Sequence, residues 1–262
     1  MNTIPKSTTE SEKPYSNQYG QKLKAKTELY RKLNRSLIYI DLLAQKLIAG
    51  DAVLDIATGL SDVPLLLYQK GFKVFAIDHN EDFNKEHRNF IVPDITFING
   101  DIFDMSFKTN QFKGIIAKDI LEHIPDEKLA PLLQRISTLL QQEGLLVVGC
   151  PVKTFSSRIL RLHNKIKYKN FEGIDDTGDT THLHWFTEKS LRQKLSSLKE
   201  FSIMDVKYVM YGINHFPRVF ILPLWYLQKI LHSKYISRLW ASKIIQKLFG
   251  FRIVIVLKKT KL

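Results

Sequence analysis

Cysteine and long apolar runs are both scarce in this chain. The single cysteine, Cys150, excludes an internal disulfide framework and a four-cysteine zinc site, and it fits a reducing compartment. No segment reaches the ~18–20 uninterrupted apolar residues of a spanning helix; the nearest, residues 219–228, is broken by Pro223. The first twenty residues are polar and lack the apolar region of a signal peptide. We therefore expect a cytoplasmic protein.

Charge is distributed unevenly along the 262 residues, whose net charge is +13. Residues 1–50 carry a net charge of +5, residues 51–150 carry −6 and residues 151–262 carry +14. The basic flanks suit a nucleic acid or an anionic membrane surface as a partner. The length suits one large domain, so we expect a disordered arm over 1–20 and a single domain over 21–262.

Short apolar runs alternate with amphipathic stretches from residue 51 onward. This alternation predicts an α/β fold with a parallel sheet covered on both faces. A helical cap over 21–50, with its helix running to Ala49, precedes it, and Thr187 is expected to cap a helix that runs to Leu198. The other expected helices are 60–70, 81–89 and 125–142, and the expected strands are 52–56, 73–77, 95–98, 114–117, 145–148, 201–211 and 252–257.

The strongest functional signal lies at the turn from the first strand into the next helix, in VLDIATGLSD (53–62). The second strand ends in an acid, Asp78, nineteen residues after Gly59. Ligands of open parallel sheets bind at the carboxyl ends of the strands, where Gly59 lets a ligand approach the backbone. Asp78 is then placed to accept hydrogen bonds from ribose hydroxyls. The pattern predicts an adenosine-type ligand.

Charge distinguishes between two adenosine-type cofactors, NAD and S-adenosylmethionine. A dinucleotide fold requires glycines at positions 57, 59 and 62, which here hold Ala57, Gly59 and Asp62. A carboxylate at Asp62 repels a pyrophosphate and competes for the same helix N-terminus. The expected mouth of the site also gathers acidic side chains: Asp55, Asp78, Asp101, Asp119 and Glu122. Such a mouth favours S-adenosylmethionine, which bears a sulfonium and an ammonium group, over NAD.

With these residues the sequence resembles the class I S-adenosylmethionine-dependent methyltransferases over about residues 30–200. The matching stretches are VLDIATGLSD (53–62), VFAID (74–78), INGDIF (98–103), FKGIIAKDILEHIPD (112–126) and GLLVVGCP (144–151). The similarity is greatest to the group with an LEH(I/V)PD segment after strand four, and HLHWFTEKSLRQKL (182–195) resembles that group too. The resemblance implies a Rossmann-like, doubly wound, mostly parallel seven-stranded sheet with an antiparallel last strand and a helical C-terminal insert. Residues 51–151 would form the cofactor-binding half and residues 152–262 the acceptor-side half.

The resemblance also implies which residues bind the cofactor. Asp55 and the backbone of 56–59 would hold the methionine end, and Asp78 the ribose. Asp101 would bind the adenine amino group and the Ile102 N–H an adenine ring nitrogen, with the Lys118 carbonyl near the cofactor's amino group. The full expected set is Asp55, Ile56, Ala57, Thr58, Gly59, Asp78, His79, Asp101, Ile102 and Lys118.

Two positions depart from the family pattern. Ala57 replaces the usual first glycine and Ser61 the third. Ser61 either crowds the cofactor or caps the following helix. The acids at strand ends also have a purely structural alternative, since such residues often cap helices and turns.

The acceptor side is expected to use histidines and Glu122. Methyl transfer depends mainly on alignment and exclusion of water, and a hydroxyl acceptor also benefits from a base. His123 is the candidate catalytic base; alternatively it is a helix-start histidine bonded to backbone. His182 and His184 alternate with Leu183, so an extended backbone places both on one face, as acceptor-binding residues with Glu122 or as a structural latch.

A metal site is the other possibility at the same place. Asp175, Asp176 and Asp179 lie just upstream of the histidine pair, but no ligand spacing here is diagnostic. From the sequence we expect no metal.

The C-terminal region is strongly basic, with eleven Lys or Arg and no Asp or Glu over residues 206–262. An expected helical insert, about 216–249, interleaves these with aromatic and aliphatic residues. It either covers the acceptor pocket with its basic residues solvated, or lies in a membrane interface. We expect a lid that docks transiently on the inner membrane face. No RNA-binding or stacking motif appears, so nucleic acid is not the expected partner.

These observations predict a class I methyltransferase of a small-molecule or lipid-linked acceptor, with O-methylation as the expected reaction. The alternative is a catalytically silent protein of the same fold that binds a partner or a membrane. An NAD-linked oxidoreductase is disfavoured by Asp62. The sequence leaves the acceptor and the oligomeric state open.

Overall fold

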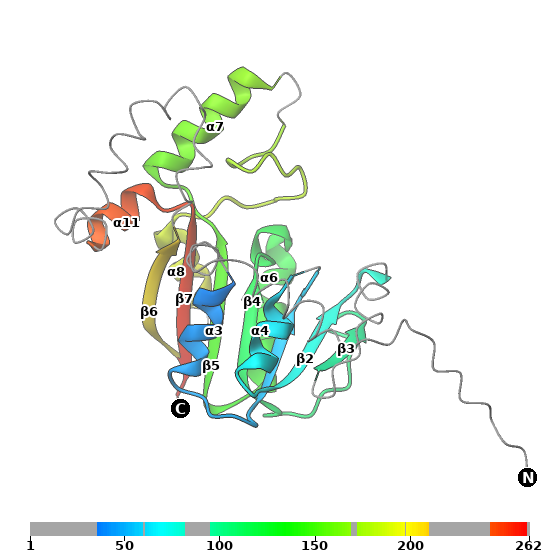
Figure 1. The fold of residues 1–262 in the computed structure, drawn as a ribbon. Coiled ribbons are helices and arrows are strands. Elements are labelled where there is room, and N and C mark those ends of the chain that lie inside the picture. Colours follow the sequence, from blue (N-terminus) through cyan, green and yellow to red (C-terminus); the bar gives the residue numbers. More distant parts are fainter. Residues whose placement is uncertain are drawn as a thin grey trace, which may run out of the picture.

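Seven strands form one sheet in the computed structural model, which describes residues 36–59, 61–81, 95–168, 172–196, 198–209 and 242–260. The strand order is β3-β2-β1-β4-β5-β7-β6 (Figure 1). Neighbours from β3 to β5 pair in parallel, whereas β7 is antiparallel to both β5 and β6. This confirms the predicted α/β sheet, mostly parallel and with an antiparallel last strand. The strands are β1 (Ala52–Ile56), β2 (Lys73–Asp78), β3 (Ile95–Asn99), β4 (Phe112–Lys118), β5 (Leu140–Pro151), β6 (Phe201–Val209) and β7 (Arg252–Lys259).

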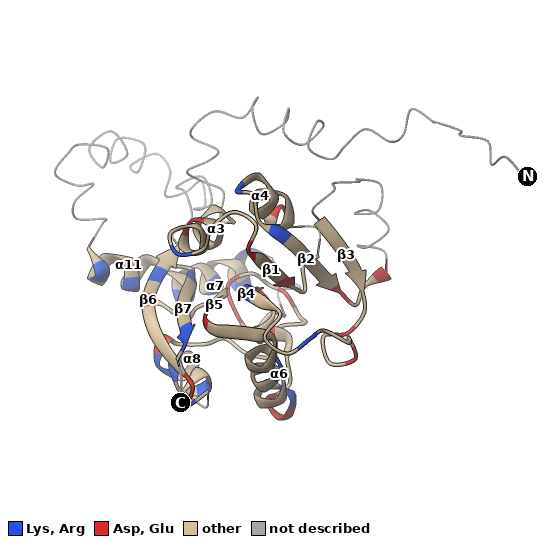
Figure 2. Ribbon diagram, turned by 90° about the horizontal axis from the view of Figure 1, so that it is seen from below, with Lys and Arg blue, Asp and Glu red and all other residues tan. Residues whose placement is uncertain are grey.

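Helices cover both faces of this sheet (Figure 2). Helices α3 (Leu37–Ala44) and α4 (Val63–Gln69) lie on one face, and α6 (Asp126–Leu139) and α8 (Glu188–Leu195) lie on the other. Each face has its own apolar core, and the alternation of side chains along a strand divides residues between them. In β1, for example, Val53 packs with α3 and α4, whereas Leu54 packs with α6.

Two glycines let α3 approach the sheet closely. A Cβ on Gly149 of β5 would lie 1.8 Å from Oη of Tyr39, and one on Gly114 of β4 would lie 3.3 Å from Cδ2 of Leu43 and 2.8 Å from Cδ2 of Leu47, just after α3. Tyr39 and Leu47 are both buried. The helical cap is therefore part of the core on this face of the sheet.

Four predicted helices are shorter than expected, among them the one predicted to run to Leu198, which is α8 and ends at Leu195. The helix predicted to reach Ala49 ends at Ala44, because the chain then turns into β1 through Gly50, which has φ of +89°. The helix predicted over 125–142 ends at Leu139, because Leu140 is extended and pairs with β4. The helix predicted from residue 60 is α4, which begins at Val63 and has a proline in its first turn.

Helix α7 (Phe155–Lys167) was not predicted. It begins at a capping box, in which the Ser157 N–H donates to Thr154 Oγ1 at 3.3 Å and the Thr154 N–H donates to Ser157 Oγ at 2.8 Å. It lies beyond the carboxyl ends of the parallel strands, beside α11 (Lys243–Phe249) (Figure 1). Its apolar residues face outward rather than into the sheet core, but they recur at helical spacing, so the sequence carries a signal for α7 that the prediction overlooked.

Several other predictions are met or lie outside the described residues. Thr187 caps α8, accepting from the Ser190 N–H at 3.1 Å. The arm over 1–20, the predicted helix 81–89 beyond Glu81, and residues 216–241 of the basic insert lie outside the described residues. Within the described part of the chain, no helix is long and apolar enough to cross a membrane.

Candidate functional site

The carboxyl ends of β1, β2 and β4 meet at one edge of the sheet. Ile56 pairs with Ile77 of β2 on one side and with Ala117 of β4 on the other. The segments that follow these three strands therefore lie side by side. They contain most of the predicted cofactor residues, together with Glu122 and His123.

The turn after β1 is held by two carboxylates. Thr58 Oγ1 donates to Asp55 Oδ2 at 2.6 Å, and the Gly59 N–H donates to Asp78 Oδ2 at 2.8 Å. Ala57 and Gly59 have φ of +54° and +52°, the left-handed region that disfavours residues with a Cβ. A Cβ on Gly59 would meet nothing within 4 Å, so the turn is open on that side to a ligand.

Asp55 is a buried acid at the centre of this turn. Burial, with smaller contributions from Asp78 and Asp62, raises the pKa of its carboxyl to about 7 against the opposing effects of the Thr58 hydrogen bond and the Lys118 charge. A carboxyl group desolvated in this way gains stability from a cation placed against it. The ammonium group of a methionine is such a cation.

Asp78 closes the neighbouring turn. Its Oδ1 accepts from the Asn80 N–H at 2.8 Å and lies 3.7 Å from Nδ1 of His79, whose side chain is 83% exposed. Ser61 Oγ accepts from the Val63 N–H at 3.4 Å at the start of α4, which agrees with the capping interpretation of that residue. Asp78 thus has a structural role in addition to its predicted role at a ribose.

The loop after β3 places Asp101 and Ile102 differently. Asp101 is exposed and its Oδ1 accepts from the Phe103 N–H at 3.0 Å. Ile102 is buried, and its carbonyl accepts from Arg135 Nε at 3.3 Å. The Arg135 guanidinium also bonds the Met105 carbonyl. Arg135 of α6 thereby supports the loop expected to bind adenine.

Fewer acidic side chains gather at the mouth of the site in the structure than the sequence suggests. Asp119 forms an ion pair with Arg252 at the start of β7, and its Oδ2 lies 3.7 Å from Nζ of Lys118. The Asp119 charge is therefore compensated. Glu122 lies in η1 (Leu121–His123) and groups with histidines. The acids at the turn after β1 are Asp55 and Asp78, which accept hydrogen bonds from Thr58 and Gly59.

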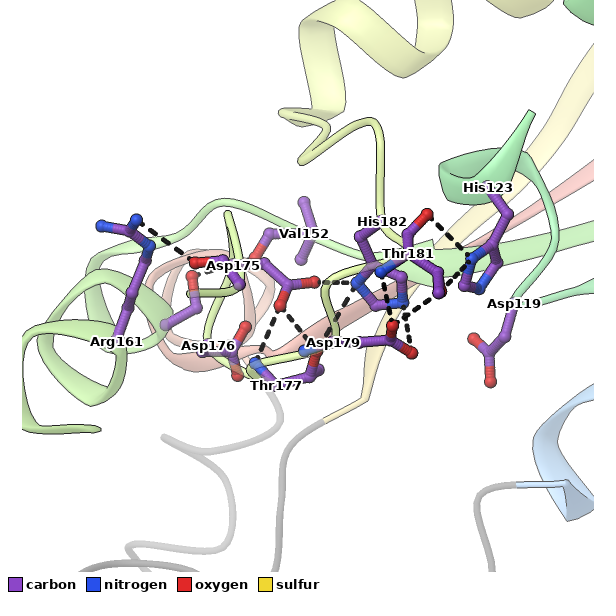
Figure 3. A network of polar contacts seen from close by, with 12 residues as sticks. Asp119, His123, Val152, Arg161, Asp175, Asp176, Thr177, Asp179, Thr181 and His182 are labelled. Atoms are coloured by element: carbon purple, nitrogen blue, oxygen red, sulfur yellow. Dashed lines mark hydrogen bonds and ion pairs between the residues drawn. The ribbon is translucent and has the colours of Figure 1, made fainter. Parts of the chain in front are cut away.

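A second cluster forms where the segment around His182 docks on η1. The N–H groups of Leu183 and His184 both donate to the Glu122 carbonyl, at 2.7 and 3.1 Å. This brings the rings of His123 and His182 to a centroid separation of 4.6 Å in an edge-to-face arrangement. Figure 3 shows His182 between Asp175 and Asp179, with Thr181 beside His123.

The pKa values of the two histidines in this cluster are shifted in opposite directions. Burial and the neighbouring His182 lower the pKa of His123, against the Thr181 carbonyl, which raises it. Burial also disfavours the charged form of His182, but its hydrogen bond to Asp175 outweighs this and raises its pKa. The pKa of Asp175 is lowered, because hydrogen bonds from His182 and Thr177 outweigh burial. His123 is thus the neutral imidazole of the pair near pH 7.

Glu122 is fully buried, and neither of its carboxylate oxygens has a hydrogen-bond partner among the described residues. Burial raises the pKa of this carboxyl to about 8, with Asp175 and Asp179 adding to the rise. An unpaired buried carboxyl is unfavourable unless a ligand or ion meets it.

His184 lies apart from this cluster. Its Nε2 is 2.9 Å from the Ile124 carbonyl, and its ring stacks on Phe186 at 5.2 Å. The structure thus brings His182 to His123 and leaves His184 in the arrangement of a latch between the 182–186 segment and the end of η1.

Comparison with known proteins agrees with this arrangement. Residues 53–144 match a family model described as a methyltransferase domain. An S-adenosylmethionine-dependent methyltransferase from Archaeoglobus fulgidus is 20% identical, with a TM-score of 0.55 over 94% of this chain and 100% of that one. The chain has the class I methyltransferase fold.

Two further methyltransferase structures show the same fold. The 1,6-didemethyltoxoflavin-N1-methyltransferase of Burkholderia thailandensis, solved with its acceptor and S-adenosylhomocysteine, is 16% identical, with a TM-score of 0.55 over 94% of this chain and 84% of that one. Phosphoethanolamine N-methyltransferase 2 of Haemonchus contortus, solved with S-adenosylmethionine, is 15% identical, with a TM-score of 0.53 over 87% of this chain and 53% of that one. No curated protein sequence matches the chain.

The methyltransferase fold and the match of residues 53–144 to a methyltransferase domain bear out the predicted fold and agree with S-adenosylmethionine as the cofactor. The narrower LEH(I/V)PD group stays a prediction. Sequence reasoning missed Thr181 and Arg252 as partners of His123 and Asp119. Thr181 stands next to His182 and could have been noticed, but nothing local marks Arg252, which lies 133 residues from Asp119.

Proposed function

We propose that this protein is an S-adenosylmethionine-dependent methyltransferase that methylates a hydroxyl group of a small or lipid-linked acceptor. One observation carries the proposal. The carboxyl edge of the sheet joins an open turn with a buried acid, Asp55, to a cluster of Glu122, His123 and His182. The first part suits a cationic adenosine cofactor and the second suits an acceptor with an ionisable proton.

The cofactor side uses groups that the structure places in the turn after β1 and at the end of β2. Asp55 would bind the ammonium group, and the backbone of 56–59 would lie along the methionine end. Asp78, which accepts from the N–H groups of Gly59 and Asn80, would also accept from the ribose hydroxyls. Asp101, Ile102 and the Lys118 carbonyl keep their predicted roles at the adenine and at the cofactor's amino group, and His79 stays in the expected cofactor-binding set.

S-adenosylmethionine supplies a methyl group on a positively charged sulfur that leaves as a neutral thioether. The chain's task is to align the acceptor, exclude water and remove a proton. Nδ1 of His123 lies 3.3 Å from the Thr181 carbonyl, which can only accept, so the hydrogen bond requires a proton on Nδ1. Nε2 of His123 then has the free lone pair that accepts the acceptor's proton as the new O–C bond forms.

The test compares His123→Ala with His163→Ala, the same change on α7, at saturating cofactor. A panel of phenols, catechols and prenyl-linked alcohols serves as acceptors, and formation of S-adenosylhomocysteine is measured. We expect His123→Ala to lose about 10²- to 10⁴-fold in turnover, as for a general base, and His163→Ala to retain the parent rate. A loss below about tenfold would contradict the assignment of His123.

Calorimetry with S-adenosylmethionine tests the cofactor half separately. We expect saturable binding at one site. A protein that folds but does not bind the cofactor would instead be the catalytically silent form of the fold, since Ala57 holds a strained backbone at the turn that meets the ligand.

A membrane surface is the second part of the proposal, and α7 supports it. Its outward residues Phe155, Ile159, Leu162 and Ile166 are 57, 47, 60 and 78% exposed, at helical spacing. Basic residues Arg158, Lys165 and Lys167 lie on the same helix, and Phe249 of α11 contacts Phe155. Basic amphipathic helices of this kind bind anionic lipid interfaces.

We therefore expect a cytoplasmic protein that is peripheral at the inner membrane face, with an acceptor drawn from that surface. Co-sedimentation with vesicles of phosphatidylcholine alone and with added phosphatidylglycerol tests this. Binding that needs the anionic lipid, and that Ile159→Ser with Leu162→Ser weakens, is the expected result. Equal failure to bind both vesicles would refute it.

A further inference from the structure

Glu122, His123 and His182 offer three metal-binding atoms at one point. One carboxylate oxygen and one nitrogen from each imidazole lie within 4.8 Å of one another. The residues come from η1 and from a segment some sixty positions later, which backbone hydrogen bonds to the Glu122 carbonyl hold together. The cluster is thus fixed by the fold rather than by one flexible loop.

The buried Glu122 is the observation that points to an absent ligand. Its side chain has no exposed surface, and both of its oxygens lack a hydrogen-bond partner among the described residues. A structural glutamate in such a place would be expected to accept hydrogen bonds from neighbouring donors. Here its carboxylate faces two imidazoles, whose ring nitrogens are also ligands for a cation.

Both imidazole rings are held in place by hydrogen bonds to their Nδ1 atoms. Nδ1 of His182 bonds Asp175, whose Oδ1 accepts from the N–H and Oγ1 of Thr177 at 2.9 and 2.6 Å. Nδ1 of His123 contacts the carbonyl and Oγ1 of Thr181, at 3.3 and 3.0 Å. Metal-binding histidines are typically held this way, by a carboxylate or a carbonyl on the nitrogen that does not bind the ion. This points to Nε2 of each ring as the ligand atom, and Nε2 of His182 also lies 3.6 Å from Oδ2 of Asp179.

We propose that Glu122, His123 and His182 form a binding site for a divalent transition-metal ion, most favourably Zn²⁺. Two imidazoles and one carboxylate suit Zn²⁺ and its first-row neighbours, whereas Mg²⁺ and Ca²⁺ prefer oxygen ligands alone. Ligand atoms around a tetrahedral Zn²⁺ lie about 3.4 Å apart at bond lengths of ~2.1 Å. Small side-chain rotations close the set from its present spread to that distance.

Three protein ligands leave a coordination position open, as in catalytic zinc sites. Resting on the proposed function, that position would take the acceptor's hydroxyl oxygen. Coordination lowers the pKa of a bound hydroxyl, whose proton passes to solvent water. With the ion bound, His123 acts as a ligand rather than as a proton acceptor.

The experiment uses the full-length, tag-free protein, stripped with a chelator and dialysed. Titration with Co²⁺, followed by visible absorption, and with Zn²⁺, followed by calorimetry, should show one equivalent bound. Glu122→Gln and His123→Gln should each weaken binding by at least tenfold, while His163→Gln on α7 leaves it unchanged. Circular dichroism and thermal unfolding of each variant confirm that it is folded.

Absence of stoichiometric Co²⁺ and Zn²⁺ binding by the folded parent protein would overturn the site, as would equal binding by the Glu122 and His123 variants. Calorimetry with S-adenosylmethionine on the same preparation separates the two proposals. Cofactor binding without metal binding refutes the metal site and leaves the proposed function standing. Metal binding without cofactor binding supports the site and refutes the proposed function.

Discussion

The two halves of the site are built in different ways. The cofactor side is local: Asp55, Thr58 and Gly59 stand within one turn, and Asp78 joins them from the next strand along the chain. The acceptor side is assembled from η1 and the 175–184 segment, more than fifty residues apart. The cofactor side presents a backbone turn that is open to a ligand, whereas the acceptor side presents side chains oriented by other side chains. Ligand binding on one side should therefore be separable from binding on the other.

Asp55→Asn should have the largest effect on ligand affinity and should impair the cofactor side alone. The change keeps the shape of the side chain but removes the charge that meets an ammonium group. A charge-assisted hydrogen bond contributes ~1.5–3 kcal/mol, so affinity for S-adenosylmethionine should fall on the order of 100-fold by calorimetry. Affinity for Co²⁺ should not change. Asp104→Asn, at an exposed acid in the loop after β3, is the control; a matching loss there would show that the effect is not specific to Asp55.

Asp175→Asn should weaken metal binding on the acceptor side and leave cofactor binding unchanged. It removes the carboxylate that orients His182, and loss of such a partner typically weakens metal binding by about 10- to 100-fold. Titration with Co²⁺ should show this weakening, while affinity for S-adenosylmethionine stays within about twofold. If the two affinities fell together, the halves of the site would not be independent.

The pH dependence of cofactor binding should sharpen the comparison. Asp55 has a pKa of about 7 in the folded protein, and only its ionised form pairs with an ammonium group. Affinity for S-adenosylmethionine should therefore rise about fivefold between pH 6 and pH 7, and Asp55→Asn should flatten this rise. Without cofactor the sign is opposite: the native state binds the extra proton, so stability contributed by Asp55 is lost as pH rises from about 4 to 7. Chemical unfolding at several pH values measures it.

Ala57→Gly should have the smallest effect. Ala57 adopts φ of +54°, which a residue with a Cβ tolerates at a cost of ~1–2 kcal/mol. Glycine removes that strain but increases the entropy of the unfolded chain, so the free energy of unfolding should rise by at most about 1 kcal/mol. Urea unfolding measures the change. A clear loss of stability would show that the Ala57 methyl group has a packing role.

Local patterns were enough to predict the sheet and the cofactor turn. The alternation of strands and helices, the ends of β1 and β2, and the cap at Thr187 all depend on residues close together in the chain. Helix α7 was overlooked although its apolar residues recur at helical spacing, and only the structure shows that they face outward instead of joining the sheet core. The extent of α6 was overestimated because Leu140 pairs with β4, a contact that helix propensity does not report.

The sequence by itself determined that an acid, a turn and a second acid follow neighbouring parallel strands, and this is sufficient to place a cofactor. Only the tertiary structure decided which charges remain uncompensated. Arg252 reaches Asp119 because β7 enters the sheet two places from β4, and Glu122 remains unpaired because the docking of residues 182–184 buries it against two imidazoles. The periodicity of a helix or strand can be recognised from a few neighbouring residues. Whether a charge is compensated depends instead on distances through space between residues far apart in the chain.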